Sequence, residues 1–233
     1  FEKSLAFQER RGNPIEISQA TNNIAVGLLE KNMVTEAERY LREGLQRLTA
    51  LQYPSGVCIL RLNLGVAAIM QRDFARARVE LDEAFGIASR LFSRRLMARI
   101  LVNRSALEME LGDFDEALRL ANEAAEMYQT LNLPLQGWSC HALLGELYRK
   151  KADEAQAIVH LERARRLAQR FKLRTGNRHK ALLYLARAYH ATGRSEDALD
   201  ALAEARTLAT DLGASEPLNE IEALQRELRL YSS

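Results

Sequence analysis

The chain has 233 residues, of which 47% are hydrophobic and 27% are charged, and its formal net charge at pH 7 is +2. This is the balance of a soluble protein with a sizeable core, and the net charge is too small for bulk electrostatics to drive binding to nucleic acid. The sequence contains no apolar run of about 18 residues, so we expect no membrane span. Only four prolines and 6% aromatic residues favour helix over sheet.

One period runs through the whole chain. Several residue types recur at a step of 40, so the sequence predicts an array of structural repeats rather than a single globular core. The alanine series is Ala37, Ala77, Ala117 and Ala157, with Ala198 one step of 41 later; the other series are Asn23, Asn63 and Asn103, then Pro14, Pro54 and Pro134, then Leu51, Leu91 and Leu131.

Each period divides into two helices. In the second period, apolar residues follow helical spacing up to Arg72-Asp73, where the pattern breaks, and a new helical run then begins. The prolines between periods are expected at or just ahead of a helix start, where their missing N–H has no partner. In chain order we expect the second helix of a truncated repeat at 1–12, five helix pairs at 14–53, 54–93, 94–133, 134–174 and 175–214, and a closing helix at 216–233.

The pairs resemble tetratricopeptide repeats. Leu64-Gly65 precedes an Asp73-Phe74 turn and then Ala77, Leu81 and Ala84, and the same turn recurs at Gly112-Asp113-Phe114. The third pair departs from this pattern, with Arg104-Ser105 where Leu-Gly is usual and Glu108 in place of an aromatic residue.

This resemblance implies an all-α fold, a right-handed superhelical α-solenoid of antiparallel helix pairs whose first helices line the concave groove. The period of 40 is similar to that of the long-repeat subclass found in kinesin light chains and LGN-type adaptors. It is also similar to the C-terminal arrays of bacterial STAND ATPases and MalT-like transcription regulators.

The groove residues would then carry the function. Asn23, Asn63 and Asn103 are expected to form a row that binds a peptide backbone, because an amide is both donor and acceptor; alternatively, each Asn only bonds to the neighbouring repeat. The groove is expected to be apolar at Val66, Met70 and Met109, and basic at Arg149, Lys150, Lys180 and Arg187, beside Tyr184 and His190. A ligand with apolar and acidic segments would match both parts, unless the basic side chains are merely solvated.

A second basic cluster spans residues 163–178. We interpret it as a solvated helix face beside acidic neighbours, and its lack of interleaved aromatic residues argues against direct nucleic-acid binding.

Neither catalysis nor metal binding is indicated. The four histidines lack metal-site spacing, and Cys140 and His141 point about 100° apart on a helix. No phosphate-binding loop is present, and we therefore expect no enzyme activity, no cofactor and no metal. Cys58 and Cys140 are expected to be free thiols, as is usual in the reducing cytoplasm.

The sequence thus predicts a non-catalytic scaffold that binds a protein or peptide in its groove. Because residue 1 is Phe rather than Met, we expect the chain to be part of a longer protein, and the resemblance implies that it is the sensor or interaction part of a larger bacterial-type signalling or transcription regulator. The alternative is an effector-sensing domain that binds a small molecule or docks on an ATPase or DNA-binding domain of its own parent chain.

Overall fold

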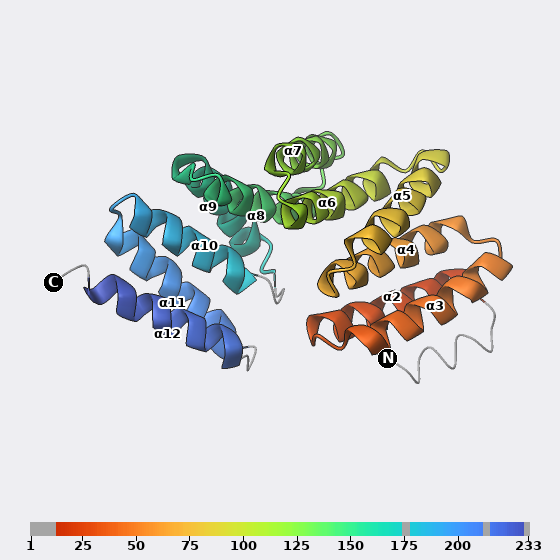
Figure 1. The fold of residues 1–233 in the computed structure, drawn as a ribbon, viewed down its shortest axis with the longest axis horizontal. Helices are drawn as coiled ribbons and strands as arrows, with labels where there is room; N and C mark the ends of the chain where they lie inside the picture. Colours follow the sequence, from red (N-terminus) through yellow and green to blue (C-terminus); the bar gives the residue numbers. More distant parts are fainter. Residues whose placement is uncertain (1–12, 174–177, 212–214, 231–233) are drawn as a thin grey trace. The chain divides into compact units, whose positions relative to one another are not determined.

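The computed structural model describes residues 13–173, 178–211 and 215–230, and every element in them is an α-helix (Figure 1). The expected helix at 1–12 lies outside the described residues. The helices are α2 (Pro14–Glu30), α3 (Val34–Ala50), α4 (Pro54–Met70), α5 (Phe74–Arg90), α6 (Arg94–Leu111), α7 (Phe114–Thr130), α8 (Pro134–Lys150), α9 (Glu154–Arg170), α10 (Arg178–Ala191), α11 (Ser195–Asp211) and α12 (Ser215–Leu230).

Consecutive helices form the predicted pairs. Within the described residues, α2 lies against α3, α4 against α5, α8 against α9 and α10 against α11, while Ser105 joins α6 to α7 by donating to the Ala117 carbonyl at 2.7 Å. The all-α solenoid of antiparallel helix pairs predicted from the sequence is confirmed. We number the pairs one to five, from α2–α3 to α10–α11.

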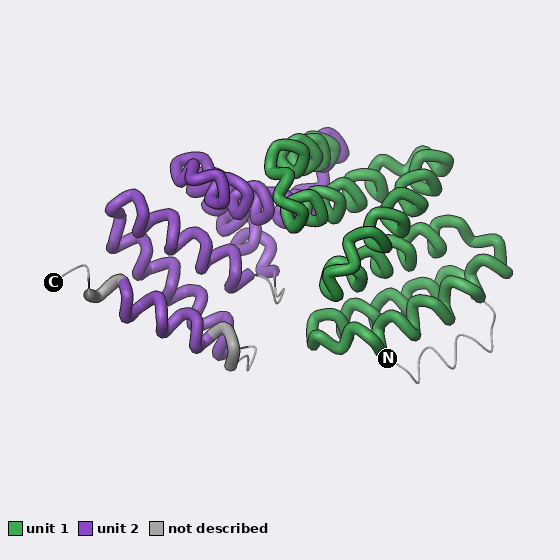
Figure 2. Tube along the Cα trace, in the orientation of Figure 1, with its two compact units in different colours: residues 1–127 green, residues 128–233 purple. Residues whose placement is uncertain are grey.

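Two compact units divide the chain, Phe1–Met127 and Tyr128–Ser233, with the boundary inside α7 (Figure 2). In the first unit α2 lies beside α4 and α4 beside α6, so its first helices are neighbours. In the second unit α8 lies beside α10, and α10 beside the closing helix α12. Each unit therefore presents its own face of first helices.

The helix starts follow from the sequence. Pro14, Pro54 and Pro134 open α2, α4 and α8, as expected for a residue without an N–H. Three of the second helices begin behind an aspartate cap: Asp73 Oδ1 accepts from the Arg76 N–H, Asp113 Oδ1 from the Glu116 N–H, and Asp153 Oδ1 from the Gln156 N–H, each at 3.1 Å. The turn motif seen in the sequence is therefore a helix cap.

The helix ends share one geometry. Among the residues that the structure describes, nine turn residues, nearly all 20 positions apart, have left-handed φ, and two of these nine are glycine, Gly112 at 86° and Gly193 at 74°. At Phe92, with φ of 50°, the N–H of the next residue, Ser93, bonds to the Ala88 carbonyl at 3.0 Å. This is the Schellman ending, which satisfies the last carbonyls of a helix. The other non-glycine residues with left-handed φ are Asn32, Gln52, Arg72, Asn132, Ala152 and Lys172.

The core depends on close approach between paired helices. Ala157, Leu161 and Ala164 on α9 are at most 1% exposed. A Cβ built on Gly145 of α8 would lie 2.7 Å from Leu161 Cδ2 and closer still to Cγ, and a Cβ on Gly65 of α4 would lie 2.8 Å from Leu81 Cγ. The Leu-Gly of the repeat motif is thus explained, because the facing leucine fills the space that a side chain would need.

The unusual residues of pair three form polar contacts with pair two. Glu108 is 8% exposed and accepts two hydrogen bonds from Arg78, at 2.9 and 3.1 Å. Arg104 forms an ion pair with Asp82, and its guanidinium carbon lies 4.5 Å from the centre of the Phe85 ring. These side chains join α6 to α5, which accounts for the departure from the repeat pattern.

Candidate binding face of the first helices

The three asparagines predicted as a peptide-binding row differ in accessibility. Asn63 is only 3% exposed, and its Nδ2 donates to Asn22 Oδ1 at 2.9 Å. Arg99 Nη2 lies 3.5 Å from Asn63 Oδ1, and Asn103 Nδ2 donates to the Arg99 carbonyl at 2.9 Å. The contacts of Asn63 are those of the stacking alternative, because they connect α2, α4 and α6.

Asn23 and Asn103 retain more open surface than Asn63. Asn23 is exposed, and its Oδ1 accepts from Asn22 Nδ2 at 3.3 Å. Asn103 is half-buried. An amide has two N–H groups and two acceptor lone pairs, so both side chains keep capacity for a ligand.

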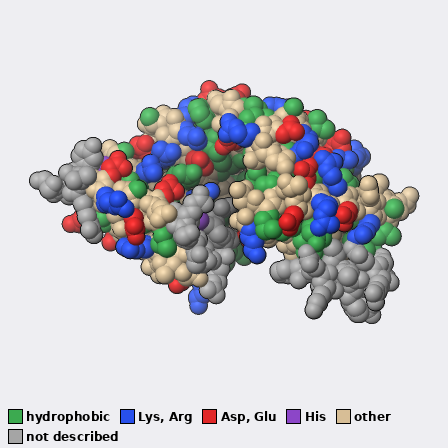
Figure 3. Space-filling view, turned by 60° about the horizontal axis from the view of Figure 1, so that its bottom comes forward, with side chains coloured by type: hydrophobic (Ala, Val, Ile, Leu, Met, Phe, Trp, Pro, Cys, Tyr) green, Lys and Arg blue, Asp and Glu red, His purple; other side chains and the backbone are tan. Residues whose placement is uncertain are grey.

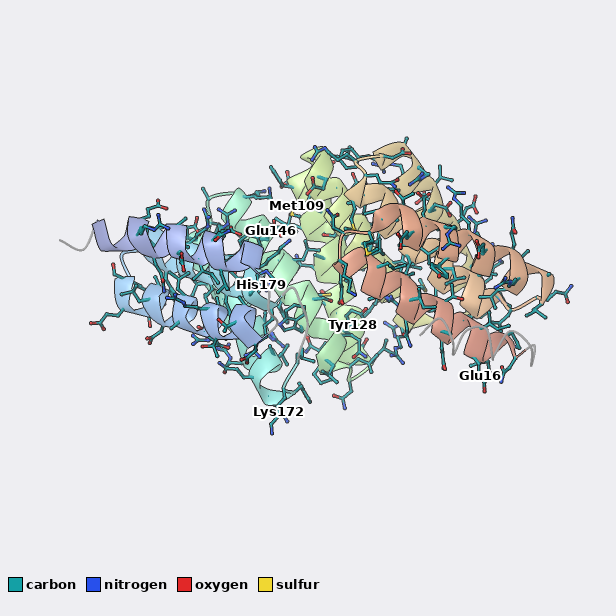
Figure 4. The ribbon with its side chains drawn as sticks, turned by 90° about the horizontal axis from the view of Figure 1, so that it is seen from below. Glu16, Met109, Tyr128, Glu146, Lys172 and His179 are labelled. Carbon is teal, nitrogen blue, oxygen red and sulfur yellow. The ribbon has the colours of Figure 1, made fainter. Side chains whose placement is uncertain are left out.

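The apolar residues expected in the first unit form a narrow surface. Met70, at the end of α4, is 41% exposed, whereas Val66 and Met109 are half-buried (Met109 is labelled in Figure 4). Val66 also packs against the buried cluster of Leu29, Ala37 and Ala67. Met70 therefore offers the largest apolar contact of the three, with a flexible thioether side chain.

In the second unit an arginine stacks on a tyrosine. The Arg149 guanidinium carbon, on α8, lies 5.3 Å from the centre of the Tyr184 ring on α10. The Tyr184 hydroxyl donates to Glu146 Oε1 at 3.0 Å, and burial together with Glu146 raises the pKa of Tyr184 (Glu146 is labelled in Figure 4). Arg149 Nε is buried and has no hydrogen-bond partner among the described residues. This N–H is an unused donor beside the predicted basic surface.

The remaining basic residues are interleaved with acids. Arg187 Nη2 lies 3.5 Å from Glu220 Oε1 on α12, and the two side chains are 42% and 50% exposed. Lys150 is exposed at the end of α8, and His190 is half-buried on α10. The expected basic surface is thus partly neutralised by Glu146 and Glu220. On the face of the molecule that Figure 3 draws, acidic and basic side chains are interspersed.

Part of the second basic cluster is paired with acids. Glu204 on α11 accepts from Arg165 at 2.8 Å, from Arg178 at 2.6 Å and from Gln169 at 3.1 Å. Burial disfavours the charged form of Glu204, but the hydrogen bonds and charge of Arg165 outweigh it, so the pKa of Glu204 is lowered. The paired arginines match the interpretation of a helix face beside acidic neighbours. Arg174 lies outside the described residues.

One pair of facing histidines was not predicted from the sequence. His141 on α8 and His160 on α9 place their Nδ1 atoms 3.1 Å apart, and their ring centres are 5.4 Å apart. Tyr148 stacks on the other side of His160, with ring centres 5.4 Å apart. The two histidines are 19 positions apart, so no short motif reveals them; alignment of the 40-residue periods would have shown that they occupy facing positions.

The cysteines are buried and free. Burial raises the pKa of Cys58 to about 11 and that of Cys140 to about 12, so neither thiol is an activated nucleophile. The described residues contain no group of three or more metal-binding side chains. Among the described helices, none combines the length and apolar character needed to cross a membrane.

Comparison with known proteins gives structural similarity only. No model of a known protein family matches the chain, and no curated protein matches it in sequence. BtubC (BKLC) from P. vanneervenii is similar in structure with a TM-score of 0.68 and 21% identity, over 91% of this chain and 89% of that one.

Two further solved structures show the same likeness. PilF from Pseudomonas aeruginosa has a TM-score of 0.61 and 20% identity, over 94% of each chain. A STAND protein with a tetratricopeptide repeat sensor from Pyrococcus horikoshii has a TM-score of 0.66 and 16% identity, over 88% of this chain but 32% of that one. With its helix pairs, its glycine–leucine contacts and these similarities, the chain has the fold of the tetratricopeptide-repeat proteins.

Proposed function

We propose that the chain is a non-catalytic scaffold that binds a protein or peptide segment along the faces of its first helices. The observation that carries this proposal is a contrast between two sets of arginines. Beside Glu204, Arg165 on α9 and Arg178 at the start of α10 are held at 2.8 and 2.6 Å. Arg149 on α8 instead has a buried Nε without a hydrogen-bond partner among the described residues, and Arg187, further along α10, has a long contact of 3.5 Å with Glu220. Polar groups with unused capacity are what a ligand requires.

The chemistry of these faces suggests the class of ligand. In the first unit, Met70 and the amides of Asn23 and Asn103 suit a segment with an apolar side chain and an accessible backbone. In the second unit, Arg149, Lys150 and Arg187 suit an acidic segment that competes with Glu220. We propose a partner that carries both kinds of segment, without requiring that one ligand reach both units.

The setting of the scaffold is a further part of the proposal. The similarity to a STAND protein with a tetratricopeptide repeat sensor supports a role as the sensor of a larger cytoplasmic regulator. The same similarity favours a second candidate, in which the first-helix face docks on another domain of the parent chain or senses an effector. Both candidates use the same residues, so one set of variants addresses both.

A displayed peptide library provides the test. Peptides selected on the immobilised chain are expected to be enriched in acidic residues together with apolar ones. Arg149→Glu combined with Arg187→Glu should weaken the best peptide at least tenfold, an effect that shrinks with added salt. Arg166→Glu is the matched control, since Arg166 is 65% exposed on α9. Equal weakening by the control, or no enrichment at all, would contradict the proposal.

A further inference from the structure

Each helix pair has a position where its two helices face one another, and the residues there differ between repeats. In pair two the position holds Arg61 and Glu80, joined at 2.8 Å. Forty residues on, in pair three, it holds the buried Leu101 and Leu120. Forty residues further, in pair four, it holds His141 and His160. The three repeats thus fill one place with an ion pair, two aliphatic side chains and two imidazoles.

The contact between the imidazoles depends on their protonation. With Nδ1 atoms 3.1 Å apart, one ring must donate its Nδ1–H and the other must accept with a lone pair. A first proton can add at Nε2 of the donor ring, which keeps the N–H···N bond but places a positive charge in the pair; a second proton, on the acceptor, removes its lone pair and brings two N–H groups face to face. His141 is 8% exposed, so water reaches the new charge poorly.

The surrounding charges oppose protonation of the pair. Arg163, on the same helix as His160, disfavours a second positive charge on either histidine. The nearby carboxylates have other partners among the described residues: Glu146 accepts from Tyr184, and Glu162 accepts from Tyr189, both on α10.

Other charged or titratable groups on the neighbouring helices also have partners other than the histidine pair. Glu162 forms ion pairs with Arg165 and Arg166, and Arg178 at the start of α10 is bound by Glu204. His179 on α10 is buried and has interactions of its own. Tyr148 stacks on His160 and brings no carboxylate to it. An imidazolium in this pair therefore lacks a carboxylate partner.

We propose that His141 and His160 form an acid-sensitive joint that opens the α8–α9 pair when the histidines take up a proton. The neutral pair holds the two helices together through one N–H···N hydrogen bond and the stacked rings. Burial and Arg163 disfavour the first positive charge, and protonation of both rings breaks the bond and places like charges in contact. The proposal does not depend on any binding partner, since it concerns the stability of one helix pair.

The direction of the effect follows from linkage. Burial, with Arg163 and His160, lowers the pKa of His141 from 6.5 to about 4, and burial and Arg163 lower the pKa of His160. The unfolded chain therefore binds these protons before the folded chain does. The contribution to stability is intact above the ordinary pKa and is lost as the pH falls through the range between the two values. At pH 5, His141 alone should raise the opening constant on the order of 10-fold.

Hydrogen exchange of the whole chain, measured at pH 7 and pH 5 and corrected for the intrinsic exchange rate, tests the proposal. The opening constant of α8 and α9 peptides should rise on the order of 10-fold at pH 5 relative to that of α4 and α5 peptides. His141→Leu combined with His160→Leu, which copies pair three, should abolish this difference. If that variant fails to fold, His141→Arg with His160→Glu copies the ion pair of pair two.

Three results would overturn the proposal. One is an equal pH response of the wild type and the folded variant. Another is the observation by NMR that His141 and His160 titrate independently near the ordinary histidine pKa. The third is binding of Zn²⁺ at pH 7.5 that is lost in the leucine variant, since two ring nitrogens at this spacing would then be metal ligands rather than a proton-sharing pair.

Discussion

The glycine of the repeat motif gives the sharpest test of how the helix pairs pack. In α8, Gly145 faces Leu161, and Gly137 has nothing within 4 Å of an added Cβ. Both are buried in the same helix of the same unit. Substitution of each by alanine thus changes the backbone preference equally and differs only in steric contact.

The two effects can be separated in magnitude. Alanine is preferred over glycine in a helix by about 1 kcal/mol, so Gly137→Ala should be stabilising by about that amount. In Gly145→Ala the new methyl would lie 2.7 Å from Leu161 Cδ2, too close for van der Waals contact, and closer to Cγ, which cannot swing away as a side-chain end can. Overpacking of this kind costs about 1–3 kcal/mol. Because the gain in helix preference is common to both variants, we expect a difference between them of about 1–3 kcal/mol.

Urea unfolding monitored by far-UV circular dichroism measures this difference. The single Trp138 lies on α8, so its fluorescence reports on the same pair. A second-site change, Leu161→Ala, should reduce the steric part of the Gly145→Ala penalty when the two are combined. If Gly145→Ala is as stable as Gly137→Ala, the close approach of α8 and α9 at Leu161 is wrong.

Three further predictions concern other parts of the chain. Asn63→Ala should destabilise the first unit by about 1–2 kcal/mol, because it leaves Asn22 without its partner, and denaturant unfolding would show it; an unchanged stability would return Asn63 to the ligand-binding row. Ala152→Gly should raise the melting temperature by up to about 4 °C, since Ala152 holds a φ of 59°, and a lower melting temperature would contradict the turn geometry. Glu204→Gln should lower the free energy of unfolding by about 2–3 kcal/mol at pH 7 and by less in acid. Because the pKa of Glu204 is lowered in the folded chain, the stability that its charge contributes is present above the ordinary pKa and is lost as the pH falls through the lowered pKa; a penalty independent of pH would refute the ionic role.

The fold was predictable because its determinants repeat. The buried set of Ala77, Leu81 and Ala84 recurs at equivalent places in pairs four and five, and pairs one and three each change one of its residues, so the core of one pair predicts most of the core of the next. Because the turns are mostly three residues long, each helix runs antiparallel to the one before it and packs against it. Many weak contacts of one kind produce the repeat pattern in the sequence, so the pattern is still recognisable where a single residue departs from it, as Arg104 does in place of leucine.

The polar contacts were less predictable because each depends on a particular neighbour. Asn63 has the spacing of a ligand-binding residue, yet Asn22 and Arg99 on adjacent helices enclose it. Glu108 in isolation resembles a defect in the repeat, and only Arg78 on the preceding pair explains it. The facing of His141 and His160 likewise needs the register between two helices, which no local pattern contains.

The net charge of the basic surface was likewise not predictable from the sequence. The sequence places Arg149 and Arg187 on first helices, but it does not show that Glu146 and Glu220 lie among them. A ligand must therefore compete with these acids rather than enter an uncompensated positive field. In the proposed function, Glu146 and Glu220 reduce the net positive charge that an acidic segment of the ligand meets.

Photo-crosslinking tests most directly whether ligands occupy the first-helix face. A photoreactive p-benzoylphenylalanine is placed either at Lys180, exposed on α10, or at Thr207, exposed on α11, and the best library peptide is added at a saturating concentration. We predict a covalent adduct with the peptide at Lys180 and none at Thr207. Adducts at Thr207 alone, or at both positions with equal yield, would contradict the assignment of the binding face to the first helices.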